Sequence, residues 1–354
     1  MALNDRLILD FSSPTIQKTI EEYLAEGVFT HSFLSVFIFA LDWLKGKTDF
    51  EFQTSGSTGK SKILNVSKSQ IISSVESTAS FFDLQKGDKV FLCLNTLFTG
   101  GKMMLARAIH LKLEVHVVSP ANLDLEITDY YKLTAFVPNQ MYCILETDKS
   151  ISFLSHFENI LIGGAAVNQL LLEKIKKIKS SKVYETFGMT ETLSHIALKL
   201  LNTESSSNIF EVLPTIEVKT DELDCLMVKS KVTNNEWVQT KDIVKLVDSQ
   251  HFEWKGRLDN VINSGGIKIY PEQVECWIAP ILASLNFNND FFMTSIEDEK
   301  LGEKLVIVME GEEFETENLL QTLKQSLPKF HAPFSLIFKS RFERTLSGKI
   351  IRKL

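Results

Sequence analysis

The chain has 354 residues, of which 44% are hydrophobic and 23% charged, values typical of a globular protein with more than one domain. Its formal net charge of −7 argues against nucleic acid as a partner, since nucleic-acid-binding proteins usually present a basic field. The four cysteines (Cys93, Cys143, Cys225 and Cys276) form no C-x-x-C pair, which disfavours a zinc site and a dense disulfide framework.

The N-terminal region shows neither a signal peptide nor a membrane anchor. The opening MALNDRLILD lacks a basic segment followed by a long apolar one. Ser13 followed by Pro14 predicts a helix start with Ser13 as the N-cap. The most apolar run, Phe33 to Leu44, is too short to span a bilayer and predicts a buried helix. We therefore expect a cytoplasmic protein without a membrane span.

A loop rich in Gly, Ser and Thr follows. The segment 52–62, FQTSGSTGKSK, can direct several backbone N–H groups and hydroxyls at one anion. Gly59, Lys60 and Ser61 fit the end of the P-loop pattern G-x-x-x-x-G-K-[ST], but Thr54 stands where its first glycine belongs. From the pattern alone, the loop is either a chance near-match or a phosphate loop of another kind.

Short apolar runs then alternate with helical patterns, which predicts an α/β fold with a mostly parallel sheet covered on both faces. The expected strands are 89–94, 114–118, 159–164 and 182–188, and the expected helices 68–82, 101–111, 138–146 and 168–178.

The pattern changes at residue 209. Short β segments separated by turns predict a small antiparallel sheet or barrel; they lie at 209–213, 216–220, 225–230, 236–240, 243–247 and 251–256. A mixed pattern follows, with helices near 271–279 and 317–327 and strands near 291–296, 304–310 and 335–339. We place a boundary at about 256–260, which gives domains 1–256, with a β-rich part at 209–256, and 257–354.

Each motif that could carry chemistry also has an ordinary structural explanation. Gly163-Gly164-Ala165-Ala166 could be a strand-to-helix turn, and Thr190-Glu191 could be a first helical turn. Asp242, Arg257 and Asp259 could be solvated loop charges, and Lys349 lies in a basic tail that could be frayed.

The order and spacing of the motifs nevertheless resemble the adenylate-forming (ANL) superfamily of acyl-CoA synthetases, adenylation domains and luciferases. The matching segments are TSGSTGKSK from residue 54, GGAA from 163, ETFGMTET at 185–192, TKD at 240–242, GRLDNVINSGGIKIYPEQVE at 256–275 and RTLSGKI at 344–350. The resemblance implies a large N-terminal domain containing mostly parallel sheets and a small β-barrel or antiparallel segment, and a small mobile α+β C-terminal domain.

The resemblance also implies residue roles around ATP. The loop would hold the β- and γ-phosphates through Thr54, Ser55, Gly56, Ser57, Thr58, Gly59 and Lys62. Gly163, Gly164 and Ala165 would border the adenine, and Phe187 stands where the family usually has a Tyr that stacks on the base. Thr186 and Gly188 would also bind the nucleotide. Thr190 would contact the α-phosphate and Glu191 would bind Mg²⁺, which needs few carboxylates when phosphates are present.

Further roles concern the ribose, the domain motion and CoA. Asp242 and Arg257 resemble the residues that hold the ribose hydroxyls, and Asp259 resembles the hinge of the C-terminal domain. Lys349 resembles the lysine that enters the site during adenylation. Gly265 and Gly266 are expected to line the pantetheine channel, where the lack of side chains permits close approach.

The chain departs from the family pattern at several points. Ser61 replaces a usual Pro, Lys241 replaces a usual Gly, and Thr99 stands where a His is common. Only about fifty residues precede the phosphate loop, where full-length relatives have well over a hundred. Because the motifs of both halves of the site remain, we expect a compact but active enzyme.

GMTETLSHIALKLLN (188–202) and GGKMMLARA (100–108) most resemble the short bacterial o-succinylbenzoate–CoA ligases of menaquinone biosynthesis. The implied substrate is an aromatic dicarboxylic acid, so a cationic or polar group should meet the carboxylate that is not activated. Lys102, Arg107 and His195 are the candidates, and Arg107 could equally be a surface helix residue.

Several alternatives stay open: another acyl- or aryl-CoA ligase, an acyl-adenylate synthase that loads a carrier protein, a regulatory AMP-binding protein and a P-loop NTPase. Retention of Glu191, Arg257 and Lys349 disfavours a non-catalytic AMP sensor. The expected partners are therefore ATP, Mg²⁺, CoA and an acid; a homo-oligomer is left open.

Overall fold

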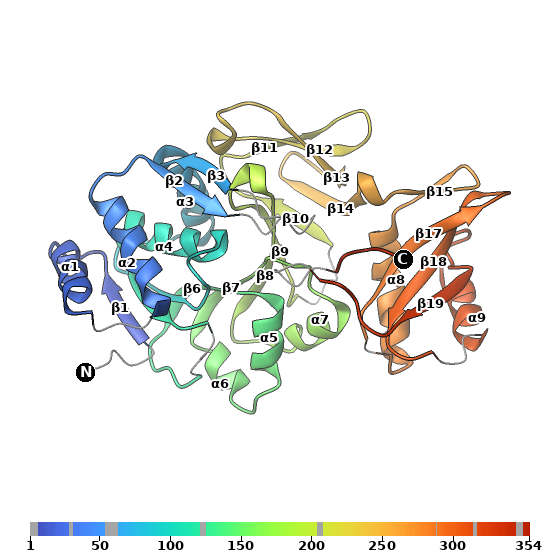
Figure 1. Ribbon diagram of the computed structural model, residues 1–354, viewed down its shortest axis with the longest axis horizontal. Helices are drawn as coiled ribbons and strands as arrows, with labels where there is room; N and C mark the ends of the chain where they lie inside the picture. The colour runs from blue at the N-terminus through green and yellow to red at the C-terminus, as the bar shows by residue number, and fades with distance from the viewer. Residues whose placement is uncertain are drawn as a thin grey trace. The chain divides into compact units, whose positions relative to one another are not determined.

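The computed structural model describes residues 6–27, 31–53, 63–120, 125–203, 208–287, 289–313, 317–344 and 350–354. The chain forms two compact units (Figure 1). The first comprises Met1–Val167, Leu171–Val218 and Val228–Val238, and the second Asn168–Leu170, Lys219–Met227 and Gln239–Leu354. The two units divide the chain by compactness, whereas the predicted boundary at 256–260 follows a change of sequence pattern, so that boundary stays a prediction.

The core of the first unit is a sheet with parallel strands at its centre. In spatial order these are β5 (Glu114–Val118), β4 (Lys89–Leu92), β6 (Tyr131–Phe136), β7 (Phe157–Ile162) and β8 (Lys182–Gly188). The mostly parallel sheet predicted from the alternating pattern is thus confirmed. The central strand β6 was not predicted, and it completes the sheet between β4 and β7.

Antiparallel strands extend this sheet at both ends. β1 (Arg6–Asp10) pairs with β5, while β9 (His195–Leu200) pairs with β8 and β10 (Ile209–Val212) pairs with β9. The β8–β9 hairpin contains the 3₁₀ turn η1 (Thr190–Thr192), which places the predicted Mg²⁺ residue at the tip of the hairpin.

Helices cover both faces of the sheet, as predicted. On one face α5 (Pro138–Leu145), α6 (Ser150–Leu154) and α7 (Gln169–Ile175) pack against a core that includes Phe91. Because side chains alternate along a strand, Val90 and Leu92 face the opposite side, where α4 (Thr99–Leu111) packs on β4, β5 and β6. α3 (Lys68–Phe82) packs against α4.

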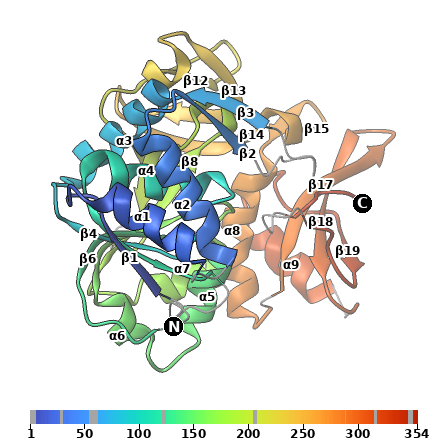
Figure 2. The ribbon, with the colours of Figure 1, turned by 60° about the vertical axis from the view of Figure 1, so that its left-hand side comes forward.

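The first two helices lie side by side (Figure 2). α2 (His31–Leu44) is the buried helix predicted from its apolar run, with Phe33 and Phe37 completely buried. The predicted start of α1 was wrong: the helix spans Ile16–Glu26 with Thr15 as N-cap. Ser13 instead forms a turn before the helix, in which its carbonyl accepts from Ile16 N at 3.3 Å.

A separate two-stranded sheet carries the ends of the predicted phosphate loop. β2 (Asp49–Gln53) and β3 (Ile63–Ser67) pair antiparallel, with Gln53 opposite Ile63. The loop residues 54–62 lie outside the described residues. Gln53 and Ile63, the residues that flank the loop, are a cross-strand pair and therefore lie next to each other.

Strands β11 (Glu217–Thr220), β12 (Cys225–Lys229), β13 (Val238–Leu246) and β14 (His251–Arg257) are neighbours in that order. β13 replaces the two strands predicted at 236–240 and 243–247, because no Gly or Pro interrupts VQTKDIVKL. It pairs antiparallel with β14, and a bulge lies between Ile243 and Val244. η2 (Lys231–Thr233) and η3 (Leu258–Asn260) are short 3₁₀ turns.

The rest of the second unit is an α+β sandwich of two helices and a five-stranded sheet. The strands are β15 (Ile262–Ser264), β16 (Ile267–Ile269), β17 (Phe291–Asp298), β18 (Gly302–Glu310) and β19 (Ser335–Lys339). α8 (Pro271–Ser284) and α9 (Glu317–Ser326) share a core with one face of the sheet. On the other face Phe292 and Val308 pack against Phe342 and Ile350 of the C-terminal tail. In the described part of the chain, no helix is long and apolar enough to cross a membrane.

Candidate active site

The carboxyl ends of β7 and β8 bring two predicted nucleotide-binding segments together. Neighbouring parallel strands end at the same edge of a sheet, which is where α/β proteins bind ligands. Gly163 follows β7, and its N–H donates to the Phe136 carbonyl at 3.2 Å. A methyl group on Gly163 would lie 2.3 Å from Thr186 Oγ1, so any larger residue would require the Thr186 side chain to move. Gly164 and Ala165 continue from this contact.

The next residue of β8, Phe187, is half-buried and packs against Phe210, with the ring centroids 5.4 Å apart. Lys199 covers the Phe210 ring at 4.8 Å and pairs with Glu185 at 2.7 Å. A bulge between Phe187 and Gly188 shifts the register as the strand enters the turn. The aromatic side chain is thus held beside the predicted adenine-binding segment.

The turn after Gly188 is braced internally and leaves Glu191 exposed to solvent. Thr192 Oγ1 accepts from Met189 N at 3.2 Å and lies 3.0 Å from the Ser194 carbonyl oxygen. Among the described residues no group of three metal-ligating side chains is present, so a metal here would need phosphate oxygens in addition to Glu191. One exposed carboxylate, completed by phosphate oxygens and water, is a set of ligands that suits Mg²⁺. The side chain of Thr190 is not described.

The second unit brings Asp242 and Arg257 together. They stand opposite each other on β13 and β14, and Arg257 Nη1 donates to Asp242 Oδ2 at 3.4 Å. Trp254 Nε1 donates to the other carboxylate oxygen at 3.0 Å. Arg257 Nη2 also lies 3.5 Å from Asp259, where a hydrogen bond from Lys241 lowers the pKa of the Asp259 carboxyl. The two predicted ribose residues are therefore neighbours of the predicted hinge residue.

Gly265 and Gly266 form the two-residue turn between β15 and β16. Their φ angles are 58° and 82°, and two left-handed residues in succession are typical of a type I′ hairpin. The turn itself therefore explains both glycines, and the pantetheine channel stays a prediction.

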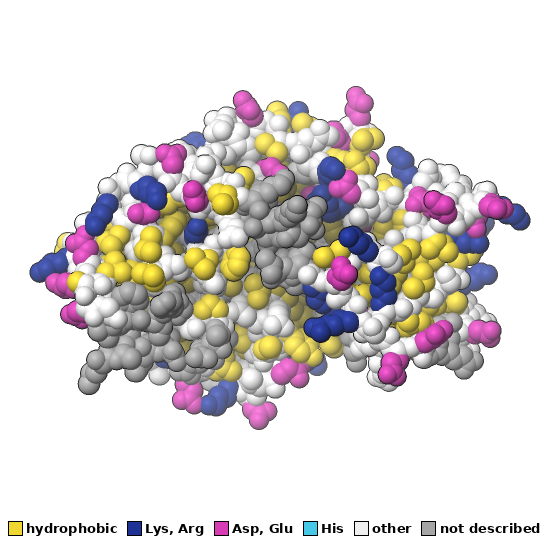
Figure 3. Space-filling view, in the orientation of Figure 1, with side chains coloured by type: hydrophobic (Ala, Val, Ile, Leu, Met, Phe, Trp, Pro, Cys, Tyr) yellow, Lys and Arg dark blue, Asp and Glu magenta, His cyan; other side chains and the backbone are white. Residues whose placement is uncertain are grey.

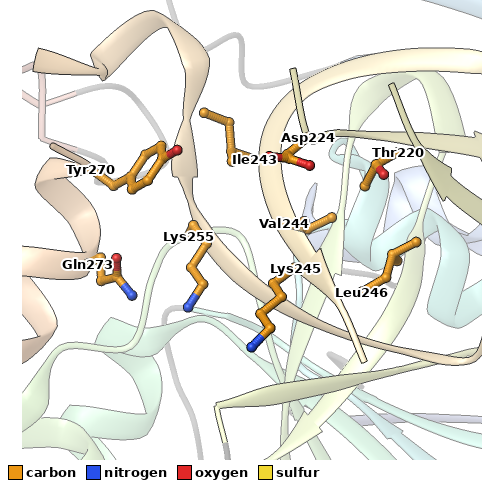
Figure 4. A pocket seen from close by; sticks show the side chains of 9 residues that line it. All are labelled: Thr220, Asp224, Ile243, Val244, Lys245, Leu246, Lys255, Tyr270 and Gln273. Atoms are coloured by element: carbon orange, nitrogen blue, oxygen red, sulfur yellow. The ribbon is translucent and has the colours of Figure 1, made fainter. Parts of the chain in front are cut away.

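A pocket of about 370 Å³ also lies in the second unit (Figure 4). Tyr270 and Gln273, at the start of α8, face the β13–β14 hairpin there, and Lys245 and Lys255 extend alongside each other. None of its nine lining residues is a predicted site residue.

Lys102, one of the three acyl-pocket candidates, lies beside the strand that enters the phosphate loop. Its ammonium donates to the Glu51 carbonyl at 2.6 Å and lies 5.4 Å from the centroid of the Phe52 ring. Burial lowers the pKa of this lysine. Thr99 Oγ1 donates to the Gln53 carbonyl at 3.2 Å, so the start of α4 is attached to β2 by two side chains.

Arg107 is 3% exposed, so the surface alternative for this residue is wrong. Its Nη2 donates to Thr78 Oγ1 at 3.2 Å and to Ser194 Oγ at 3.1 Å. Its Nε is buried and has no hydrogen-bond partner among the described residues. Burial lowers the pKa of Arg107 to about 10, with no opposing contribution from a carboxylate.

His195 completes this group. Its Nε2 lies 3.1 Å from Thr78 Oγ1 and its Nδ1 lies 3.4 Å from Ser194 Oγ. Burial, and then the positive charge of Arg107, lower the pKa of His195 well below its usual value, so the ring is neutral at neutral pH. Sequence analysis missed Thr78 and Ser194, because no short-range pattern relates a residue of α3 to one of the β8–β9 turn.

Two predicted elements of the site lie outside the described residues: the loop Thr54–Lys62 and Lys349. The chain on both sides of 345–349 is held in place. Arg344 and Ile350 form an antiparallel β-bridge, and Arg344 pairs with Asp290 at 2.7 Å. Arg352 forms a bidentate ion pair with Glu275, in which Nη1 and Nη2 donate to the two carboxylate oxygens at 2.6 and 2.7 Å.

Comparison with known proteins identifies the family. A family model described as AMP-binding enzyme matches residues 52–225. An acyl-CoA synthetase (AMP-forming)/AMP-acid ligase II-like protein from Dyadobacter fermentans, known from a crystal structure, is 35% identical to this chain. The match covers 98% of this chain and 97% of that one, with a TM-score of 0.66. The chain belongs to the AMP-binding enzymes. The resemblance seen in the motifs, the expected fold class and the prediction of an enzyme are thereby confirmed.

Two other proteins extend the comparison. A protein named 2-succinylbenzoate–CoA ligase from Lactococcus lactis is 25% identical over 320 residues, which cover 85% of this chain and 69% of the relative. The structure of O-succinylbenzoate coenzyme A synthetase from Bacillus subtilis in complex with ATP and magnesium has a TM-score of 0.67 at 21% identity, covering 85% of this chain and 68% of that one. At that identity the second likeness supports the fold alone.

Proposed function

We propose that this AMP-binding enzyme is an acid–CoA ligase that converts o-succinylbenzoate to o-succinylbenzoyl-CoA, the activity expected in menaquinone biosynthesis. In the first step a carboxylate of the acid attacks the α-phosphorus of ATP, forming acyl-AMP and releasing pyrophosphate. In the second step the thiol of CoA attacks the acyl carbon and AMP leaves. The name of the Lactococcus relative supports the acid, and the ligands of the Bacillus structure support ATP and Mg²⁺.

Arg107 carries the proposal of a dicarboxylic acid. A buried cation without a paired carboxylate is unfavourable, since removal from water destabilises the charge and nothing nearby offsets the loss. Arg107 is buried, and among the described residues no carboxylate pairs with it and no acceptor contacts its Nε. A carboxylate of the acid would supply the missing anion, and a guanidinium suits it because its donors are arranged in a planar fork.

The position of Arg107 is consistent with an acid that has a second carboxylate at a distance. Its partner Ser194 follows Glu191 by three residues, which limits their Cα separation to about 11 Å. The carboxylate to be activated must approach the α-phosphate, near Glu191 and Thr190. A molecule extending between Arg107 and this turn would therefore present one carboxylate at each end.

In the adenylation step the attacking carboxylate and ATP are both negative, so catalysis depends on positioning and on cations. We assign the β- and γ-phosphates to the loop 54–62, the ribose to Asp242 and Arg257, and the adenine to Gly163–Ala165 and Thr186–Gly188. Lys349 would stabilise charge at the α-phosphate. Mg²⁺, held by Glu191 and phosphate oxygens, would neutralise charge on the departing pyrophosphate.

For the thioester step we assign the hinge to Asp259 and the pantetheine channel to Gly265 and Gly266. A lysine placed at the α-phosphate would obstruct the incoming thiol, and rotation of residues 257–354 about a hinge would remove it. The enzyme would work in the cytoplasm, where ATP and CoA are available.

The test is acid-dependent ATP–pyrophosphate exchange, followed by thioester formation with CoA. We expect o-succinylbenzoate to give the highest kcat/KM in a panel of aryl, fatty and dicarboxylic acids. Good turnover of another acid without turnover of o-succinylbenzoate would overturn the substrate assignment. Exchange without CoA thioester would instead favour an acyl-adenylate synthase that loads a carrier protein.

A further inference from the structure

Thr78, Arg107, Ser194 and His195 form a closed ring of hydrogen bonds, here called the Arg107 network. α3 contributes Thr78, α4 contributes Arg107, and the end of the β8–β9 turn contributes the other two. Arg107 Nη2 contacts both hydroxyls, at 3.2 and 3.1 Å, and the two nitrogens of His195 contact the same hydroxyls, at 3.1 and 3.4 Å. Each hydroxyl therefore bridges the guanidinium and the imidazole.

One arrangement of protons satisfies every member of the network. Arg107 Nη2 donates one hydrogen to each hydroxyl. Thr78 Oγ1 donates to the Ser74 carbonyl at 3.2 Å and accepts from His195 Nε2, while Ser194 Oγ donates to His195 Nδ1. A neutral imidazole has one donor and one acceptor nitrogen, as this arrangement needs. The depressed pKa of His195 keeps it in that form.

The network fixes the direction in which Arg107 can still donate. Both hydrogens of Nη2 are used by hydroxyls, and the guanidinium is planar, so two bonds from one nitrogen set the orientation of the whole plane. Nε, which has no partner among the described residues, is then presented in a single direction. Because the partners of Nη2 are neutral, they orient the guanidinium without neutralising its charge.

We propose that Thr78 and His195 are positioning residues that make the enzyme selective for acids with a second carboxylate. Thr78 holds Arg107 Nη2 directly, and His195 holds the two hydroxyls that Nη2 contacts, so that the full positive charge and the Nε–H of Arg107 meet that carboxylate. An acidic residue in place of Thr78 would also accept from Arg107 but would cancel the charge that the acid needs. This inference rests on the proposed function, in which Arg107 receives the carboxylate that is not activated.

The network also joins α3 and α4 to β9, so a purely structural role must be distinguished. Loss of a structural bond would lower stability and affect every acid alike. Loss of a positioning bond would affect acids with two carboxylates and spare those with one. The ratio of the two kcat/KM values therefore separates the roles.

The experiment compares Thr78→Val, which keeps the shape and removes the hydroxyl, with Thr78→Ser, which restores it. The acids are o-succinylbenzoate and two analogues that each lack one carboxylate, 4-oxo-4-phenylbutanoate and 2-butanoylbenzoate. We expect Thr78→Val to raise the KM for o-succinylbenzoate about tenfold, the effect of one hydrogen bond to a charged group. The KM for ATP and kcat/KM for whichever analogue reacts should change less than about twofold, and Thr78→Ser should restore the wild-type KM.

Thr134→Val is the matched control. Thr134 is as fully buried as Thr78, and its Oγ1 donates to the Phe91 carbonyl at 3.0 Å, away from Arg107. It should lower the free energy of unfolding without changing the ratio between the two kinds of acid. An equal loss with both kinds of acid in Thr78→Val, or no change with either, would overturn the proposal.

A binding measurement separates this inference from the proposed function. Calorimetric titration of wild type and Thr78→Val with o-succinylbenzoate needs no turnover. Tenfold weaker binding to the variant supports the network's role even if the wild type forms no thioester, a result that would contradict only the proposed reaction. Equal binding to both proteins would overturn the network's role and leave the ligase activity standing.

Discussion

Gly163 and Thr186, on neighbouring strand ends, are in direct contact: a methyl group on Gly163 would lie 2.3 Å from Thr186 Oγ1. The contact joins the segment after β7 to the segment that leads into the Glu191 turn. A change at Gly163 is therefore transmitted to β8.

We expect Gly163→Ala to lower the free energy of unfolding by about 1–3 kcal/mol, the usual effect of overpacking, and to raise the KM for ATP. Urea denaturation and pyrophosphate exchange measure the two effects. The double variant Gly163→Ala/Thr186→Ala removes the clashing oxygen and should recover most of the stability. Wild-type stability of the single variant would contradict the contact.

Arg107→Met should separate stability from activity. Since Arg107 is buried and has no acidic partner among the described residues, methionine should leave the free energy of unfolding unchanged or raise it by up to about 2 kcal/mol. The same change should lower kcat/KM for o-succinylbenzoate about 100-fold, as expected when one member of a buried charged contact is removed. Destabilisation by more than about 2 kcal/mol, with activity retained, would indicate that Arg107 serves the core alone.

His195 should make stability depend on pH in a defined direction. Its pKa is depressed in the folded protein, while the unfolded value is about 6.5. Below that pH the unfolded chain binds a proton that the folded protein does not, so stability decreases as the pH falls, by up to about 1.4 kcal/mol per unit.

Urea denaturation at pH 7.5 and 5.5 tests this effect. His195→Gln cannot titrate, so it should show a smaller decrease than the wild type. Identical decreases in the two proteins would mean that His195 is not held neutral by its surroundings.

Lys349→Ala should impair one half-reaction and spare the other. We expect acid-dependent pyrophosphate exchange to fall by at least about 100-fold, while CoA thioester formation from presynthesised acyl-adenylate stays within about twofold. Lys353→Ala is the matched control, because Lys353 is an exposed lysine on the same tail and should affect neither reaction. Equal loss of both half-reactions would contradict the domain-rotation assignment.

Elements with strong local signals could be predicted from the sequence. The helix predicted at 68–82 matches α3, whose start has a capping box between Ser67 and Gln70 and whose end has Asp83 in the left-handed region. The strands at 114–118 and 182–188 match as well. In contrast, β6 reads YKLTAF, where Lys132 and Thr134 interrupt the apolar run. Its strand conformation is determined by its pairing with β4 and β7.

Contacts within the candidate site could be predicted where the residues belong to recognisable motifs, and not where only the fold brings the residues together. Asp242 and Arg257 belong to recognisable motifs, and they are indeed neighbours. The burial of Arg107 could have been predicted, because it lies in the otherwise apolar run MMLARAI; Met103 through Ile109 are all buried. Thr78 had no such signal, because its role depends on the packing of α3 beside α4 and the β8–β9 turn.

The short β8–β9 turn has a consequence for the redesign of this enzyme. Thr190 and Glu191, which we propose contact ATP and metal, lie in its first half, whereas Ser194 and His195, which belong to the Arg107 network, lie at its end. The other two members of the network, Thr78 and Arg107, lie on α3 and α4. Directed evolution toward a different acid can therefore concentrate its mutations on these two helices and leave the residues proposed to bind the nucleotide unchanged.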